Sequence, residues 1–257
     1  MYRSGCDEFK IIFDNSPEKK RYSAFSYNTV NLLHTQEGSN DIVLSPIEVV
    51  QAMINRCIGV EIIDQRENWC IVKELGETTY KEFDNALRRV FLLLISMAEE
   101  INKTIKPHAD KESLKSAHII DTNIDRFTDF CFRVLSKKGY QEYRKTPTMH
   151  SILFVLEMMG DEFKKVAIHL LEAKSISQKM ESLFKIQSDQ LRRYYTLFYG
   201  FNRERCLEIY EQDQKGHKYN LGVYESLNTA EKEILHHLKK IGIYILSLTE
   251  LRIDLEY

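Results

Sequence analysis

The sequence predicts a mainly helical protein, in which a small α/β segment of β-α-β-β order precedes two tandem three-helix bundles, a six-helix fold. From Thr78 to the end, apolar residues recur at intervals of three and four, the pattern of amphipathic helices. Only 4 prolines and 10 glycines interrupt the 257 residues, which favours long helices over many short strands. Before Thr78, short β-branched runs between turn residues are typical of strands.

Residues 1–77 are predicted to form the small α/β unit. Its elements, in order, are a strand over 8–13, an irregular polar stretch over 14–44, a helix from Ser45, and a hairpin of strands over 60–63 and 69–72. Ser45 can cap this helix, Pro46 suits its first turn, and Glu48 completes a capping box. The unit carries no glycine-rich phosphate loop, so we expect it to serve as a docking or linker domain.

Six helices joined by short turns should follow, with sequential helices antiparallel. We expect them over about 79–106, 110–137, 146–173, 176–199, 203–225 and 229–257. Thr79 and Asn228 are good N-caps for the first and the last. The helices divide into bundle 1 over 78–174 and bundle 2 over 175–257. Leu156–Asp161 and Leu238–Ile243 share leucine and glycine in register, which indicates a duplicated unit.

Composition and charge exclude several classes of protein. With 36 basic and 38 acidic side chains, the formal charge of −2 gives no overall basicity that would indicate nucleic-acid binding. Five widely spaced cysteines without a CxxC pair favour reduced thiols. No signal peptide opens the chain, and the longest apolar run, 90–98, is shorter than the roughly 20 residues of a membrane helix. We therefore expect a cytoplasmic protein without membrane insertion.

The main sign of function is a set of carboxylates at four-residue spacing on the second and third helices. Asp121, Asp125 and Asp129 share one helix face, and so do Glu157 and Asp161. Like charges at this spacing destabilise a helix by roughly 0.2–0.5 kcal/mol per pair. Something should therefore compensate them: a bound cation, a basic partner, or water.

Two interpretations of these acidic rows remain open. In one, both rows lie on solvated helix faces. In the other, the two helices pack side by side and the carboxylates converge on metal ions, with His118 as a further ligand one turn before Asp121. Apolar residues run beside both rows, and Gly160 would let a neighbouring backbone approach, which favours the second interpretation. Carboxylates suit magnesium, manganese, calcium or iron, and histidine shifts the preference toward iron, nickel or zinc.

Three features occur in order along the helices: the duplicated three-helix unit, Ile-Asp-x-x-Ile-Asp-Arg over 120–126, and Glu-x-x-Gly-Asp over 157–161. Together they resemble the PhoU family of phosphate-uptake regulators. The resemblance covers about 79–257 and is strongest over 82–172. The N-terminal part is similar to archaeal PhoU-like proteins, in which an AbrB-like DNA-binding hairpin often precedes the α/β segment. This chain shows no such hairpin, so direct DNA binding is not expected.

The resemblance implies a cytoplasmic, often dimeric regulator of phosphate transport and signalling, whose partners are phosphate transporter components or a signalling protein. It also implies clusters of iron or zinc on acidic faces, with manganese or magnesium as alternatives. The matching positions are Asp121, Asp125, Glu157 and Asp161. Asn123 stands where the family commonly has an acid. In bundle 2, Lys239 and Ile243 replace the acidic pair, so one cluster is expected, in bundle 1.

Other classes of function compete with this one. A metal-free adaptor of the same fold is favoured by the loss of acids in bundle 2. A transcription regulator would need a continuous basic patch. The basic residues near the acidic rows do not form one: Lys111, Lys115, Lys137, Lys138, Arg144 and Lys145. A di-iron oxidase would need two Glu-x-x-His motifs, and only 233–236 matches. We expect no catalytic activity.

Overall fold

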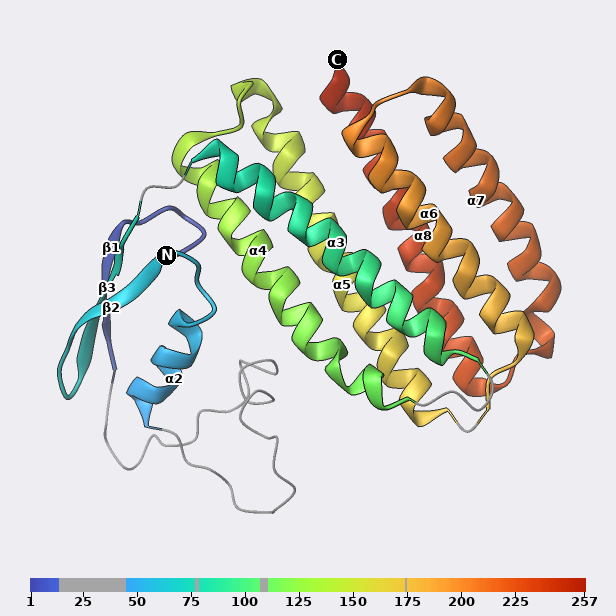
Figure 1. The fold of residues 1–257 in the computed structure, drawn as a ribbon, viewed down its shortest axis with the longest axis horizontal. Helices are drawn as coiled ribbons and strands as arrows, with labels where there is room; N and C mark the ends of the chain where they lie inside the picture. Colours follow the sequence, from blue (N-terminus) through green and yellow to red (C-terminus); the bar gives the residue numbers. More distant parts are fainter. Residues whose placement is uncertain (14–44, 77–78, 107–110, 174) are drawn as a thin grey trace.

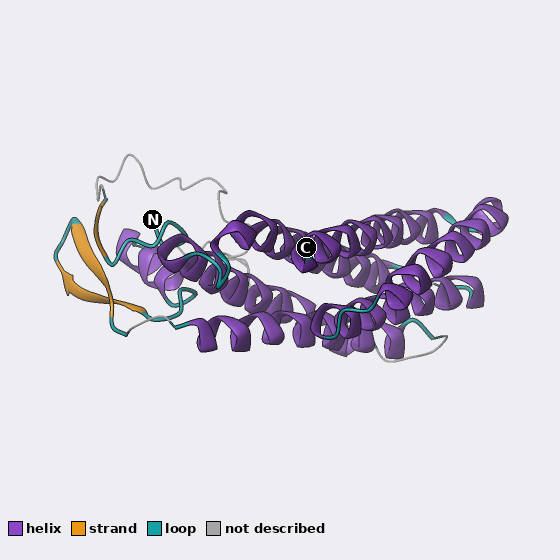
Figure 2. Ribbon diagram, turned by 90° about the horizontal axis from the view of Figure 1, so that it is seen from above, coloured by secondary structure: helices purple, strands orange, loops and turns teal. Residues whose placement is uncertain are grey.

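The computed structural model describes residues 1–13, 45–76, 79–106, 111–173 and 175–257, without the side chains of 217 and 219–221. Figure 1 shows a small sheet and a short helix beside a body of long helices, and Figure 2 shows the strands at one end of this elongated body. The predicted fold class is confirmed. The predicted irregular stretch over 14–44 lies outside the described residues.

The N-terminal unit, residues 1–13 and 45–76, has the predicted β-α-β-β order. Its elements are β1 (Glu8–Ile12), α2 (Pro46–Ile54), β2 (Val60–Gln65) and β3 (Trp69–Glu74). The strands are antiparallel in the order β1-β3-β2, so β3 lies in the centre. The predicted capping box of α2 is present, with the Ser45 hydroxyl accepting from the Glu48 backbone N–H. One face of the sheet and α2 enclose a small apolar core: Tyr2, Val50, Ile54, Val60, Cys70 and Val72.

All six predicted long helices are present. They are α3 (Tyr80–Thr104), α4 (Ala117–Lys138), α5 (Thr146–Glu172), α6 (Gln178–Tyr199), α7 (Arg203–Val223) and α8 (Thr229–Glu256). The prediction that the second helix starts near residue 110 was wrong by several residues. Glu112–Ser116 forms a 3₁₀ turn instead, because the Ser116 hydroxyl donates to the Ser113 carbonyl and the Ala117 N–H donates to the Leu114 carbonyl. None of the described helices combines the length and apolarity that crossing a bilayer requires.

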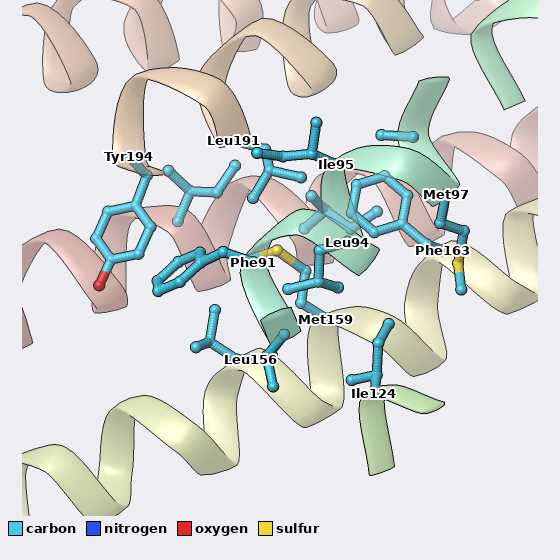
Figure 3. Close-up of a cluster of buried hydrophobic side chains, with 14 of the residues drawn as sticks. Phe91, Leu94, Ile95, Met97, Ile124, Leu156, Met159, Phe163, Leu191 and Tyr194 are labelled. Carbon is cyan, nitrogen blue, oxygen red and sulfur yellow. The ribbon is translucent and has the colours of Figure 1, made fainter. Parts of the chain in front are cut away.

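Both bundles share one continuous apolar core. Side chains from Phe83 on α3 to Leu255 on α8 belong to a single buried cluster. Figure 3 shows part of it, where Phe91 of α3 lies among Leu156 of α5 and Leu191 and Tyr194 of α6. The bundles meet chiefly where α5 packs on α8 and α3 packs on α6. The two predicted bundles therefore bury their apolar faces against each other.

The N-terminal unit lies beside α4, at the end of the helical body (Figure 1). Its small apolar core is separate from the core of the helices. Ile58 of the unit packs against the helical core. The polar and charged contacts with α4 lie along its acidic row and along the basic residues Arg133 and Lys137 that follow it.

Candidate functional site

The two predicted acidic rows come together, because α4 packs against α5. We call their five carboxylates the acidic face: Asp121, Asp125, Asp129, Glu157 and Asp161. Asp121 is the most buried, with 2% of its surface exposed, whereas half of the Asp161 side chain is exposed. Gly160 shows the close approach expected of it, but to side chains and not to a backbone. A Cβ added there would lie 3.2 Å from Ile124 Cδ1 and 3.6 Å from Asp121 Oδ1.

Two arginines of the N-terminal unit pair with the middle and one end of the acidic face. Arg56, just after α2, donates from Nη2 to Asp125 Oδ2 at 3.0 Å. Arg3 pairs with Asp129 through Nε and donates from Nη2 to Glu157 Oε1 at 2.8 Å. A single guanidinium thus joins a carboxylate of α4 to a carboxylate of α5, as the planar, multiply donating arginine head permits.

A lysine of α5 neutralises the other end of the face. Lys164 Nζ lies 2.6 Å from Asp121 Oδ2 and 2.7 Å from Asp161 Oδ1. Like Arg3, this cation joins the two acidic rows. Three cations of the chain itself thus supply part of the positive charge that the acidic rows require.

Burial and mutual repulsion still act on the carboxylates. Burial, reinforced by the charges of Asp121 and Glu157, raises the pKa of Asp125 to about 7, although Arg56 and Lys164 act to lower it. Burial also raises the pKa values of Asp121 and Asp129 above the ordinary range. Glu157 Oε2 is buried and has no hydrogen-bond partner among the residues that the structure describes. Five carboxylates facing three cations leave the region with excess negative charge.

The arrangement does not fit a metal cluster in this conformation. Carboxylate oxygens are suitable donors for hard cations. Among the described residues, however, no three acidic, histidine or cysteine side chains lie close enough to hold an ion. Arg3, Arg56 and Lys164 bind the oxygens that would have to coordinate it. The ring Nδ1 of His118 lies 2.7 Å from the Lys115 carbonyl, one turn back on the chain. The predicted cluster and its ligands stay a prediction.

Two basic residues continue the acidic row of α4, and the sequence interpretation missed their role. Arg133 and Lys137 follow Asp125 and Asp129 at the same four-residue spacing, so all four lie along one side of the helix. We call these four residues, Asp125, Asp129, Arg133 and Lys137, the α4 charge row. The four-residue spacing of Arg133 and Lys137 could have been read from the sequence. Arg3 and Arg56 lie far from α4 along the chain, so no local pattern connects them to it.

Arg133 is buried completely and holds the N-terminal segment. Its Nη1 donates to the carbonyls of Tyr2 and Cys6 at 3.0 and 2.9 Å, and its Nη2 donates to Glu74 Oε2 at 3.0 Å. Lys137 forms ion pairs with Asp7 and Glu74. The N-terminal unit therefore presents arginines to the acidic half of the row and carboxylates to its basic half.

A second buried charge cluster joins the bundles, and the sequence did not predict it. Glu162 of α5 is 3% exposed and lies 2.5 Å from Nδ1 of His237 on α8. Burial acts to raise the pKa of Glu162, but hydrogen bonds from Lys165 and His237 outweigh it and hold that pKa below the usual range. Burial also lowers the pKa of His237. The pair is therefore a carboxylate that accepts from a neutral imidazole.

Bundle 2 presents no equivalent of the acidic face on α8. Lys239, at the position of Glu157, lies with Nζ 5.3 Å from the ring centre of Tyr224, and Ile243 is 59% exposed. Gly242 faces Gln187 of α6, whereas its counterpart Gly160 faces α4. The shared leucine and glycine positions thus meet different neighbours in the two halves.

Comparison with known proteins gives one solved structure of similar fold. No family model matches the sequence, and no curated protein matches it. The crystal structure of the phosphate transport system regulatory protein PhoU from Streptococcus pneumoniae superposes with a TM-score of 0.54. It is 19% identical in sequence, and the match covers 69% of this chain and 96% of that one. At this identity the likeness shows the fold alone, so the predicted resemblance holds for the architecture.

Proposed function

We propose that this chain regulates phosphate transport or phosphate signalling by binding other proteins. The observation that carries the proposal is the fold, which matches 96% of a phosphate transport regulatory protein. The acidic motifs over 120–126 and 157–161 lie on adjacent helices α4 and α5, which adds support. Catalysis is not part of the proposal. The proposed partners are components of a phosphate transporter or a phosphate-signalling protein in the cytoplasm, and the proposed form is a homodimer.

A metal-free adaptor of the same fold is the second candidate. It is favoured by the cations that already pair with the acidic face, Arg3, Arg56 and Lys164. Both candidates act by protein contact, and they differ in whether a metal takes part.

A transcription regulator receives less support. Of the basic residues near the acidic rows, four are engaged within the chain. Lys111 donates to the carbonyls of Leu170 and Ala173, and Lys137 pairs with Asp7 and Glu74. Lys115 and Lys145 pair with neighbouring glutamates. These pairs reduce the charge that phosphates of DNA would meet.

Deletion of the gene in its host tests the proposal. We expect the deletion strain to take up phosphate in phosphate-rich medium at a rate that the wild type reaches only when starved. Returning the wild-type gene should restore the low rate, and a tagged chain should co-purify with a transporter or signalling component. Unchanged uptake and unchanged cellular phosphate in the deletion strain would rule the proposal out.

A further inference from the structure

We propose that Arg3 and Arg56 take the place of metal ions on the acidic face, and that the α4 charge row is the docking surface for the N-terminal unit of the same chain. The row consists of Asp125, Asp129, Arg133 and Lys137. This inference concerns how the molecule is held together. It agrees with the metal-free candidate, and it does not depend on a role in phosphate regulation.

The order of charges along α4 supports the docking role. The row runs from acidic to basic, and the N-terminal unit meets each half with the opposite sign. Arg56 and Arg3 contact the acidic half, and Asp7 and Glu74 contact the basic half. A shift of the unit by one helical turn toward the C-terminus of α4 would place Arg3 beside Arg133. Like charges would then face each other, so the order of charges specifies one docked position.

The separation of the two apolar cores also supports the docking role of the α4 charge row. Tyr2 and Val50 belong to the core of the N-terminal unit, and that core does not merge with the core of the helices. Ile58 is the residue of the unit that packs against the helical core among the described residues, and the other side-chain contacts of the unit with α4 are polar. These contacts are partly shielded from water: Arg133 is fully buried, and the side chains of Arg56 and Asp125 are 22% and 16% exposed. Removing one partner of a shielded pair leaves an uncompensated charge, which destabilises a protein more than the loss of an exposed pair does.

The geometry of Arg3 supports the replacement of metal. Its guanidinium bonds to Asp129 on α4 and to Glu157 on α5, and it stacks on Phe132 with its Cζ 4.9 Å from the ring centre. A metal on this face would have the same two tasks, to offset the buried negative charge and to cross-link the two helices. The arginine does both while it also anchors the first residues of the chain.

Swapping the charges of Arg56 and Asp125 tests the inference. Hydrogen–deuterium exchange would be followed on the full chain at about pH 8, above the pKa of Asp125. Arg56→Glu should speed exchange in residues 1–13 and in the first turns of α4 by about tenfold. Adding Asp125→Arg to Arg56→Glu should restore slow exchange. Arg66→Glu is the matched control, because Arg66 belongs to the same unit but pairs with Asp64 in the same hairpin.

The metal content and its effect on the N-terminal unit are measured on wild-type protein purified without chelator. Elemental analysis should find far less than one iron, zinc or manganese per chain, and EDTA should leave the exchange of residues 1–13 unchanged. Raising NaCl from about 0.05 M to about 1 M should speed that exchange, since salt screens ion pairs. This salt experiment uses no variant, so it decides the matter even where Arg56→Glu does not fold.

Two results would overturn the inference. One is exchange that responds neither to Arg56→Glu nor to salt, since the unit would then be held by other contacts. The other is stoichiometric metal whose removal by EDTA releases the N-terminal unit, since metal would then do what the arginines are proposed to do. The deletion strain tests only the proposed function, and neither of these two results depends on its outcome.

Discussion

At Gly5 the chain turns onto α4 with a φ of +81°, and a Cβ added there would lie 2.6 Å from Lys137 Cγ. We expect Gly5→Ala to strain the backbone by about 1 kcal/mol and also to displace Lys137 from Asp7 and Glu74. Its effect should appear as faster hydrogen exchange in residues 1–13.

Gly59 offers the matched control for this substitution. It has the same φ of +81°, and a Cβ added there meets nothing within 4 Å. Gly59→Ala should therefore show the backbone strain alone, which urea unfolding would measure. If both variants loosen residues 1–13 equally, then the contact between Gly5 and Lys137 has no role in holding the segment.

At the scale of elements, the contact of α5 with α8 should weaken in acid. The pKa values of Glu162 and His237 are both lowered in the folded chain. As the pH falls from about 7 to about 4, the unfolded chain binds protons at both groups before the folded chain does, so the free energy of unfolding decreases. Urea unfolding at a series of pH values would measure this slope.

Variants at adjacent histidines separate the contribution of His237. His237→Gln should flatten the slope between about pH 7 and about pH 5, because the glutamine amide can still donate to Glu162 but does not titrate. His236→Gln is the control, since His236 is exposed and adjacent. A slope that both variants flatten to the same extent would contradict the assignment to the buried imidazole.

At the scale of the whole molecule, the shared core should make the two bundles unfold together. Phe91 of α3 is fully buried, and its ring centre lies 5.0 Å from that of Phe198 and 5.6 Å from that of Tyr195, both on α6. Phe91→Ala should cost about 3–5 kcal/mol of unfolding free energy. Because one cluster spans both bundles, hydrogen exchange should accelerate in α6 and α8 as well as in α3.

Leu92→Ala on the same helix is the control for this prediction, since Leu92 is 43% exposed. It should change the free energy of unfolding by less than about 0.5 kcal/mol. Accelerated exchange confined to α3, α4 and α5 in Phe91→Ala would show instead that the bundles unfold independently.

Most of the fold could be predicted because its signals are local. The apolar spacing and the caps at Ser45, Thr79 and Asn228 act within a few residues, so the sequence contained each element directly. The start of α4 was placed too early because Glu112–Ser116 forms a 3₁₀ turn, in which the Ser116 hydroxyl also donates to the Ser113 carbonyl. A short side-chain hydrogen bond of this kind changes a helix boundary without changing the apolar pattern.

By itself, the sequence determined the helices, the acidic rows and their need for a compensating charge, because helical spacing sets which side chains share a face. Only the tertiary structure decided what compensates them. Arg3 and Arg56 reach Asp129 and Asp125 from far along the chain, and Lys164 reaches Asp121 from the next helix. Coulomb attraction depends on distance in space and not on separation in sequence, so these partners became visible only once the chain was folded.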